Sequence, residues 1–424
     1  MSKSSRRDIF VIGFALFSMF FGAGNVIFPP YLGMGSGTEW ILGFICYYIA
    51  DIGLALLALF SMFRKGGSYK IVSPLGKYAS TLLMCAIVLC IGPMLAIPRT
   101  AAMTFEMGVQ PLTSSINSVI FSIVFFIIIF LCTIRENSVI DIVGKILTPL
   151  LLAGLLILIV KGVVTPLGEV STIVQNENVA ETGIKVGYQT MDVLATMLFG
   201  VLILRSAENK GYVEYKEKNH IVGKASIVAG ILLLIVYGGL TYLGATVSSM
   251  YTLDTPKAAL MNSIVLGLLG QKGSVLFSIV VALACITTAV GLVSSCADFF
   301  SKLSKGRISY RTFIIIICVF SAIVSNVGLE QLVSIAAPVL DLVYPLTLVL
   351  IIMSFMPKLP LLSYRLASLG AFVVSILTII STYFEVSISI LDKLPLASLG
   401  FGWLVPAIIL GLIGKFAGKK YAEQ

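Results

Sequence analysis

Residues Phe20–Pro30 read FFGAGNVIFPP, and this stretch decides how the chain is interpreted. It lies within an apolar run, residues 8–34, that is long enough to span a bilayer. Two glycines and Asn25 fall near the middle of that run, and two prolines follow. Glycine admits strained backbone and proline removes a hydrogen-bond donor, so we expect the helix to unwind here.

Unwound backbone at this depth is stable only where it faces protein or a polar cavity. In membrane transporters such breaks expose carbonyls to cations and helix N-termini to anionic substrate groups. The alternative is a kinked helix whose glycines form a packing face. The density of Gly22, Gly24, Asn25 and the paired prolines favours a functional break.

The composition around this stretch is that of a membrane protein. Of the 424 residues, 58% are hydrophobic and 12% are charged, and the mean hydropathy is +1.04. A soluble domain carries about 25% charged residues. We therefore expect a single all-α membrane domain over residues 1–424, with no soluble module. The seven cysteines lack the paired spacing of a metal site, which favours a packing role for each.

Hydropathy predicts about twelve spans. They cover residues 8–34, 39–63, 78–107, 116–134, 138–162, 186–206, 221–250, 273–300, 311–327, 331–354, 364–384 and 396–417. Two longer connections, 163–185 and 251–272, fall on the same side, and in the second we expect a short helix, Ala258–Leu269, over an outer vestibule or as a plain surface helix.

Basic residues set the expected orientation. The net charge is +9, and most of the Lys and Arg residues fall in the connections on the side that holds both termini. The exceptions on the other side are Lys161, Lys185, Lys257, Lys272 and Lys393. Cytoplasmic loops are enriched in Lys and Arg, so both termini are predicted to be cytoplasmic. The charge then reflects loop anchoring, and no nucleic acid partner is expected.

A second interruption is expected in the sixth span. Thr196–Gly200 reads TMLFG and resembles SMFFG at Ser18–Gly22. Paired interruptions in corresponding helices of two repeats are typical of transporter binding sites. A chance match of five residues is the alternative.

The eighth span contributes two adjacent hydroxyls, Thr287 and Thr288, in the middle of a long apolar helix. Hydroxyl and carbonyl oxygens suit a small hard cation. Ala284 lies one helical turn before Thr287, so both can face one ion. The alternative is that each threonine bonds back to a carbonyl one turn earlier. Ser294 and Ser295 are weaker candidates.

Charged residues inside membrane spans are candidates for function. For Asp51 and Asp341 the sequence leaves open a proton or gating role and a structural hydrogen bond. Asp192 is expected in a vestibule, and Arg99 is expected either to gate the outer path or to pair with a carboxylate. The span-end acids Glu106 and Asp298 are expected at the interface.

The chain resembles the branched-chain amino acid:cation symporters, the bacterial system II carriers for leucine, isoleucine and valine. The matching segments are Phe20–Pro30 with Gly33, Gly187–Asp192, Leu283–Leu292, Ser309–Arg311 and Ser325–Leu329. The resemblance covers essentially the whole chain. It implies a leucine-transporter-type fold in a bacterial inner membrane, with inverted five-helix repeats over 8–162 and 186–354 and two further helices over 364–417.

The resemblance also implies a site. The sodium ligands would be the carbonyls of Ser18, Phe21 and Ala284 and the hydroxyls of Thr287 and Thr288. The substrate carboxylate would meet amides around Ala23, Gly24 and Asn25. Its ammonium would meet the second break at Thr196, Met197, Phe199 and Gly200. The side chain would enter a pocket between the third, sixth and eighth helices. No carboxylate is evident at the presumed ion site, which favours sodium over a proton.

The implied activity is import of substrate with sodium by alternating access, without an organic cofactor or an obligatory protein partner. An enzyme is disfavoured because the single histidine, His220, falls in a loop and no nucleotide or metal motif is present. A channel is disfavoured because one chain with two halves does not resemble a symmetric pore. Proton coupling, or another neutral amino acid, remains the alternative within the same fold.

Overall fold

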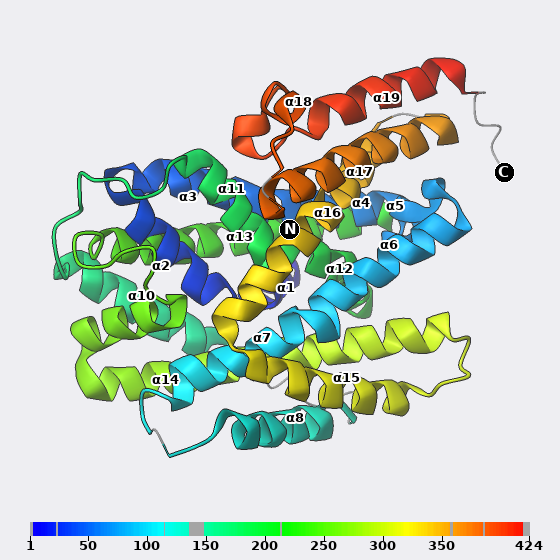
Figure 1. Ribbon diagram of the computed structural model, residues 1–424. Coiled ribbons are helices and arrows are strands. Elements are labelled where there is room, and N and C mark those ends of the chain that lie inside the picture. Colours follow the sequence, from blue (N-terminus) through cyan, green and yellow to red (C-terminus); the bar gives the residue numbers. More distant parts are fainter. Residues whose placement is uncertain are drawn as a thin grey trace.

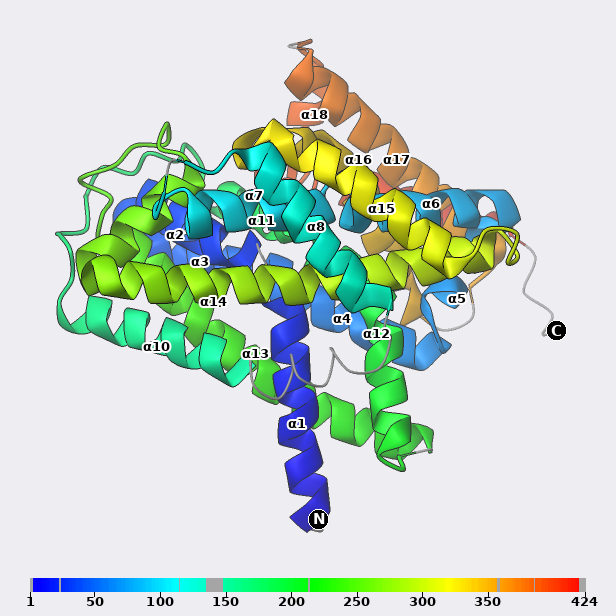
Figure 2. The ribbon, with the colours of Figure 1, turned by 90° about the horizontal axis from the view of Figure 1, so that it is seen from below.

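The computed structural model describes residues 3–22, 24–113, 115–134, 148–212, 214–356, 359–384 and 386–418. Throughout these ranges the regular structure is helical and no strand occurs. The helices form one bundle in which α14 runs across the width of the molecule (Figures 1 and 2), and the N-terminal end of α1 projects from it (Figure 2).

The N-terminal half contains interrupted helices. Its elements are α1 (Lys3–Phe20), α2 (Gly24–Ser36), η1 (Gly37–Glu39), α3 (Trp40–Tyr48), η2 (Ile49–Gly53), α4 (Leu54–Lys65), α5 (Ser68–Val72), η3 (Ser73–Leu75), α6 (Lys77–Leu89), η4 (Cys90–Met94), α7 (Ala96–Met103), η5 (Thr104–Val109), α8 (Ser118–Ile134) and α10 (Thr148–Val164). Thus α1 and α2 form the first predicted span, and α3, η2 and α4 form the second. The start of the predicted fifth span lies outside the described residues.

The C-terminal half begins with the sixth span, which is made of two helices. Its elements are α11 (Val179–Thr190), α12 (Asp192–Asn209), α13 (Tyr215–Ala245), α14 (Lys257–Leu303), α15 (Tyr310–Val324), η7 (Ser325–Val327), α16 (Leu329–Ser354), α17 (Leu361–Tyr383), α18 (Ser389–Asp392), η8 (Ala397–Leu399) and α19 (Leu404–Ala417). The last two long helices, α17 and α19, pack against each other along one side of the bundle (Figure 1).

Within the described residues, seven helical stretches are long and apolar enough to cross a membrane. Shorter apolar helices include α8, whose two faces differ in exposure. Ile120, Ile123 and Leu131 on α8 are 51–62% exposed, whereas Phe125 and Ile129 are at most 3% exposed. One face therefore contacts protein and the other presents apolar side chains outward, as expected in a bilayer. The number twelve stays a prediction.

The structure confirms the short helix expected before the eighth span. Gly270 has φ 64° and ψ −172°, and this kink divides α14 into residues 257–269 and the long spanning part. Such backbone strongly favours glycine because a side chain there would be strained. The location of the short helix over a vestibule stays a prediction.

Two glycines bring α2 into direct backbone contact with α13. A Cβ atom added to Gly33 would lie 1.9 Å from the carbonyl oxygen of Thr241, and one added to Gly244 would lie 1.8 Å from that of Pro30. Small residues that allow such close approach are typical of helix packing in membranes. This contact fixes the second half of the first span and thereby positions the break before it.

Candidate functional site

The first span is interrupted where the sequence predicted. Helix α1 ends at Phe20 and α2 begins at Gly24. The amide of Gly22 donates to the carbonyl of Phe20, and the amide of Asn25 donates to that of Gly22. In a continuous helix these amides would bond to the carbonyls of Ser18 and Phe21. Neither amide therefore makes its helical bond to the two carbonyls that were expected to face sodium, while Ala23 lies outside the described residues.

The sixth span is also interrupted, but not at the predicted position. The break is at Met191, whose left-handed backbone (φ 69°, ψ 15°) separates α11 from α12. Thr196, Met197, Phe199 and Gly200 all lie within α12, so their carbonyls are in a regular helix and the predicted unwinding there is wrong.

Two of the residues that prompted that prediction make contacts within the protein, and their expected contact with the substrate stays a prediction. The hydroxyl of Thr196 donates to the carbonyl of Asp192, 2.7 Å away. A Cβ atom on Gly200 would lie 2.6 Å from the sulfur of Met62, so this glycine serves close packing between α12 and α4. The short match with Ser18–Gly22 therefore does not mark equivalent breaks.

Asn25 connects the two breaks. Its side chain is 1% exposed, and its Nδ2 group donates to the carbonyl of Phe20, to the hydroxyl of Tyr237 and to Oδ2 of Asp192, the last at 2.8 Å. An amide nitrogen has two hydrogens, so these three acceptors share them. One side chain at the first break thus fixes the start of α12 and contacts α13.

Two carboxylates meet beside this network. Asp51, in the π-helical turn η2, is fully buried, and its Oδ1 accepts a 2.8 Å hydrogen bond from the hydroxyl of Thr190. Asp192 is 5% exposed, and the two carboxyl groups lie within hydrogen-bonding reach of each other. Sequence reasoning selected both residues separately, placed Asp192 in a vestibule and did not bring them together.

Arg99, on α7, lies at the second break. Its Nη1 donates to the carbonyl of Gln189 at 2.7 Å, and its Nη2 donates to that of Thr190 at 3.2 Å. These are the last carbonyls of α11, the end of a helix that favours cations. The guanidinium also lies 5.6 Å from the ring centre of Phe28, and the residue is 4% exposed. Its observed hydrogen bonds are therefore to backbone, not to the carboxylate that was expected as one alternative.

The threonine pair of α14 lies beside the first break. A Cβ atom on Gly22 would lie 3.8 Å from the methyl group of Thr288. Thr287 donates its hydroxyl hydrogen to the carbonyl of Ala284 at 2.7 Å, which is the back-bonding that was weighed as an alternative. This bond leaves lone pairs on both oxygens, so it is compatible with binding a cation as well. The carbonyls of Ser18 and Phe21 at this break are further oxygens of the type that such an ion prefers, and their role as ligands stays a prediction.

Other flagged acids have local partners. Oε1 of Glu106 accepts the amide of Leu329 at the start of α16. Asp298 is exposed and pairs with Lys302 at 2.6 Å, in agreement with an interface position. For Asp341, both the proton or gating role and the structural hydrogen bond stay predictions.

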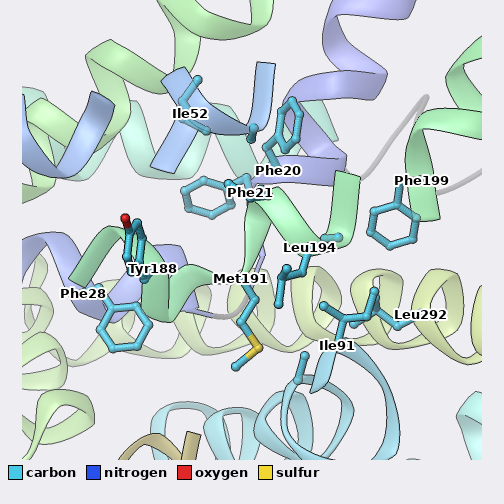
Figure 3. Packing of buried hydrophobic residues seen from close by; sticks show 14 of the residues in the cluster. Phe20, Phe21, Phe28, Ile52, Ile91, Tyr188, Met191, Leu194, Phe199 and Leu292 are labelled. Carbon is cyan, nitrogen blue, oxygen red and sulfur yellow. The ribbon is translucent and has the colours of Figure 1, made fainter. Parts of the chain in front are cut away.

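Apolar side chains surround the breaks. Figure 3 shows Phe20 and Phe21 from the first break, Met191 from the second, and Phe199 on α12 within one packed cluster. The ring of Phe199 would be 3.5 Å from a Cβ atom on Gly291 of α14. Figure 3 also labels Ile91 of the third span and Leu292 of the eighth in this cluster, so apolar side chains from several spans lie close to the polar backbone of the breaks, a combination suited to a ligand with a charged head and an apolar tail. That the substrate side chain enters here stays a prediction.

Comparison with known sequences gives one consistent relationship. A family profile described as branched-chain amino acid transport protein matches residues 5–421. The chain is 36% identical over 415 residues to the branched-chain amino acid permease BrnQ of Escherichia coli K12, covering 95% of this chain and 94% of the relative. It is 34% identical to the branched-chain amino acid transport system 2 carrier protein of Pseudomonas aeruginosa, covering 96% and 95% of the two chains.

Solved structures share the fold at low sequence identity. A sodium-coupled sialic acid symporter in a substrate-bound, outward-open state superposes with a TM-score of 0.65 at 12% identity, covering 98% of this chain and 91% of that one. MhsT in complex with L-phenylalanine gives 0.59 at 16% identity, covering 96% and 98%. These similarities establish the leucine-transporter-type fold. On the sequence relationship, the chain belongs to the branched-chain amino acid transport protein family, whose named members are permeases and carriers rather than enzymes.

Proposed function

We propose that this chain is a sodium-coupled symporter that imports leucine, isoleucine and valine by alternating access. The family and its named permeases support the substrate class. The single observation that carries ion binding is the position of the Ser18 and Phe21 carbonyls at the first break, next to the hydroxyl pair that includes Thr288. A sodium-coupled symporter among the fold relatives adds support for the ion.

In this mechanism sodium is coordinated by oxygen atoms from α1, from the first break and from α14. The substrate carboxylate meets the start of α2 at amides such as that of Gly24, because the amide of Asn25 already donates to the carbonyl of Gly22. The first two helices of each predicted repeat then rock against the rest of the protein and open the site inward. One positive charge entering at −100 mV contributes about 2.3 kcal/mol. That supports roughly fifty-fold accumulation before any sodium gradient is added.

The setting of this mechanism is a bacterial cell membrane with both termini in the cytoplasm. Lipid covers outward apolar faces such as that of α8. The two inverted repeats, the two additional helices and the absence of an obligatory protein partner are part of the same proposal.

Proton coupling is the second candidate, because one specific observation favours it. The ion site was expected to lack carboxylates, yet Asp51 and Asp192 meet in the bundle and Asp192 contacts Asn25. Two carboxylates this close and this buried hold a shared proton readily. Such a pair could take up and release one proton in each transport cycle.

Labelled leucine uptake into proteoliposomes separates these candidates. An inward sodium gradient at equal pH should drive accumulation that valine and isoleucine block and alanine does not. Accumulation driven by a pH gradient and indifferent to sodium would replace sodium by a proton. Absence of leucine uptake under every gradient would refute the proposed substrate.

A further inference from the structure

The guanidinium of Arg99 is buried at the meeting point of the two helix breaks. Its two described hydrogen bonds go to the carbonyls of Gln189 and Thr190. A Cβ atom on Gly24 would lie 2.9 Å from Nη2, so the first residue of α2 is directly beside the guanidinium. Arg99 thus stands between the carbonyl end of α11 and the amide end of α2.

Arg99 has unused hydrogen-bonding capacity. A guanidinium carries five N–H donors, and the Nε group of Arg99 has no partner although it is buried. Among the described residues, no ion pair joins Arg99 to a carboxylate. Oδ2 of Asp192 accepts a hydrogen bond from Asn25 instead. A buried cation with free donors is costly unless a ligand completes its coordination.

The surroundings select an anion. Helix α2 spans 13 residues, and its positive N-terminal end faces the break beside the guanidinium. The ring of Phe28 lies against the guanidinium and shields it on that side. A planar carboxylate matches both the donors of an arginine and the free amides of a helix N-terminus.

We propose that Arg99 binds the α-carboxylate of the transported amino acid, together with the first amides of α2. This inference rests on the proposed function and deepens it, because it makes Arg99 the residue that selects for a free carboxylate. An ammonium-bearing compound with the same side chain and no carboxylate is then rejected. Arg99 keeps its bonds to α11, so the occupied site joins the two breaks through the substrate.

The test compares leucine with leucinol, which keeps the side chain and the ammonium but replaces the carboxylate by a hydroxymethyl group. Both are used to displace labelled leucine from the purified full-length protein. Wild type should prefer leucine over leucinol by roughly 30-fold or more, the loss typical for an unpaired partner of a buried charge. In Arg99→Gln this ratio should fall to within a few-fold, because leucine loses affinity and leucinol does not. Arg307→Gln, at an exposed arginine, should keep the wild-type ratio.

A second variant covers the case in which Arg99→Gln does not fold. In Gly24→Ala the new methyl group must displace both Nη2 of Arg99 and the Phe28 ring, since each has an atom 2.9 Å from its position. It should lower the leucine-to-leucinol ratio in the same direction. Gly154→Ala, where the nearest atom is 3.6 Å away, is its control and should not alter the ratio.

The ratio of leucine affinity to leucinol affinity distinguishes a binding role of Arg99 from a purely structural role. Equal loss of affinity for both ligands in Arg99→Gln or Gly24→Ala would mean that Arg99 only supports the fold, and would overturn the proposal. A different result would also overturn the proposal: leucine binding that requires chloride, with an unchanged leucine-to-leucinol ratio in the variants. The guanidinium would then bind a free anion. If wild type transports leucine but does not discriminate against leucinol, this inference fails alone. If wild type does not transport leucine, the proposed function fails with it.

Discussion

Replacing Asn25 by aspartate puts a negative charge where the structure has a hydrogen-bond donor. The Nδ2 atom lies 2.8 Å from Oδ2 of Asp192, and two full charges at that separation repel by about 6 kcal/mol at an effective dielectric constant of 20. A bound proton limits the cost, since protonating an ordinary aspartate at pH 7 requires about 4 kcal/mol. The variant adopts the state that costs less, which is the protonated one. This cost is an upper limit, because Asp192 shares its buried position with Asp51, and it corresponds to at most about a 1000-fold loss of the intact network.

We therefore expect Asn25→Asp to lose leucine uptake in proteoliposomes at pH 7.5. Asn25→Asp combined with Asp192→Asn should recover part of it, because the new amide donates to the new carboxylate and Tyr237 can donate its hydroxyl hydrogen as well. Asn117→Asp adds the same charge at an exposed position and should transport normally. Wild-type uptake by the single variant, or no recovery in a well-folded double variant, would refute the assignment of Asn25 as the connection between the breaks.

Three further changes test other parts of the structure. Gly244→Ala should lower the midpoint temperature of thermal unfolding. Its methyl group would lie 1.8 Å from a backbone oxygen of α2, so the two helices must separate by about 1.5 Å. The control Gly223→Ala, whose nearest atom is 3.9 Å away, should leave this temperature unchanged. The double change Thr287→Ala, Thr288→Ala should raise the sodium concentration for half-maximal uptake at least about tenfold, since about 1.4 kcal/mol of binding suffices for that, and unchanged sodium activation would contradict the ion site. Met191→Val should reduce uptake and Met191→Gly retain it, because a β-branched residue is disfavoured at φ 69°; equal activity of the two would argue against a fixed break.

The features that the sequence predicted correctly are local ones. The break after Phe20 lies at Gly22 and Gly24, two of the residues that predicted it, whereas Pro29 and Pro30, which also prompted the prediction, lie inside α2. The short helix before Gly270 follows from an apolar run bounded by a connection. In both cases the residues that cause the backbone conformation are the residues that adopt it. The ranges of most spans agree for the same reason, since hydropathy depends on the segment alone.

The second break shows where such reasoning fails. Met191 has no intrinsic preference for left-handed backbone, so neither composition nor spacing identifies it. Its conformation is supported by contacts from elsewhere: Arg99 binds the carbonyl of Thr190, and the Thr190 hydroxyl binds Asp51. The only local signal was an aspartate, Asp192, in the first turn of the following helix, where a negative charge is favourable.

The division of polar contacts among the spans bears on how the site opens. Asn25, Asp51, Asp192 and Tyr237 come from the first, second, sixth and seventh spans, the two hairpins that move together in the proposed mechanism, and contacts among them can persist while these hairpins rock. Arg99 comes from the third span, outside that group, yet it binds the end of α11. Its bonds therefore cross the boundary between the moving and the stationary helices. A substrate carboxylate bound to Arg99 and to α2 would strengthen that crossing, so the loaded and empty proteins would differ in how readily the hairpins move. In this proposal substrate binding and opening of the site are coupled directly, because Arg99, which would recognise the substrate, also connects the moving helices to the stationary ones.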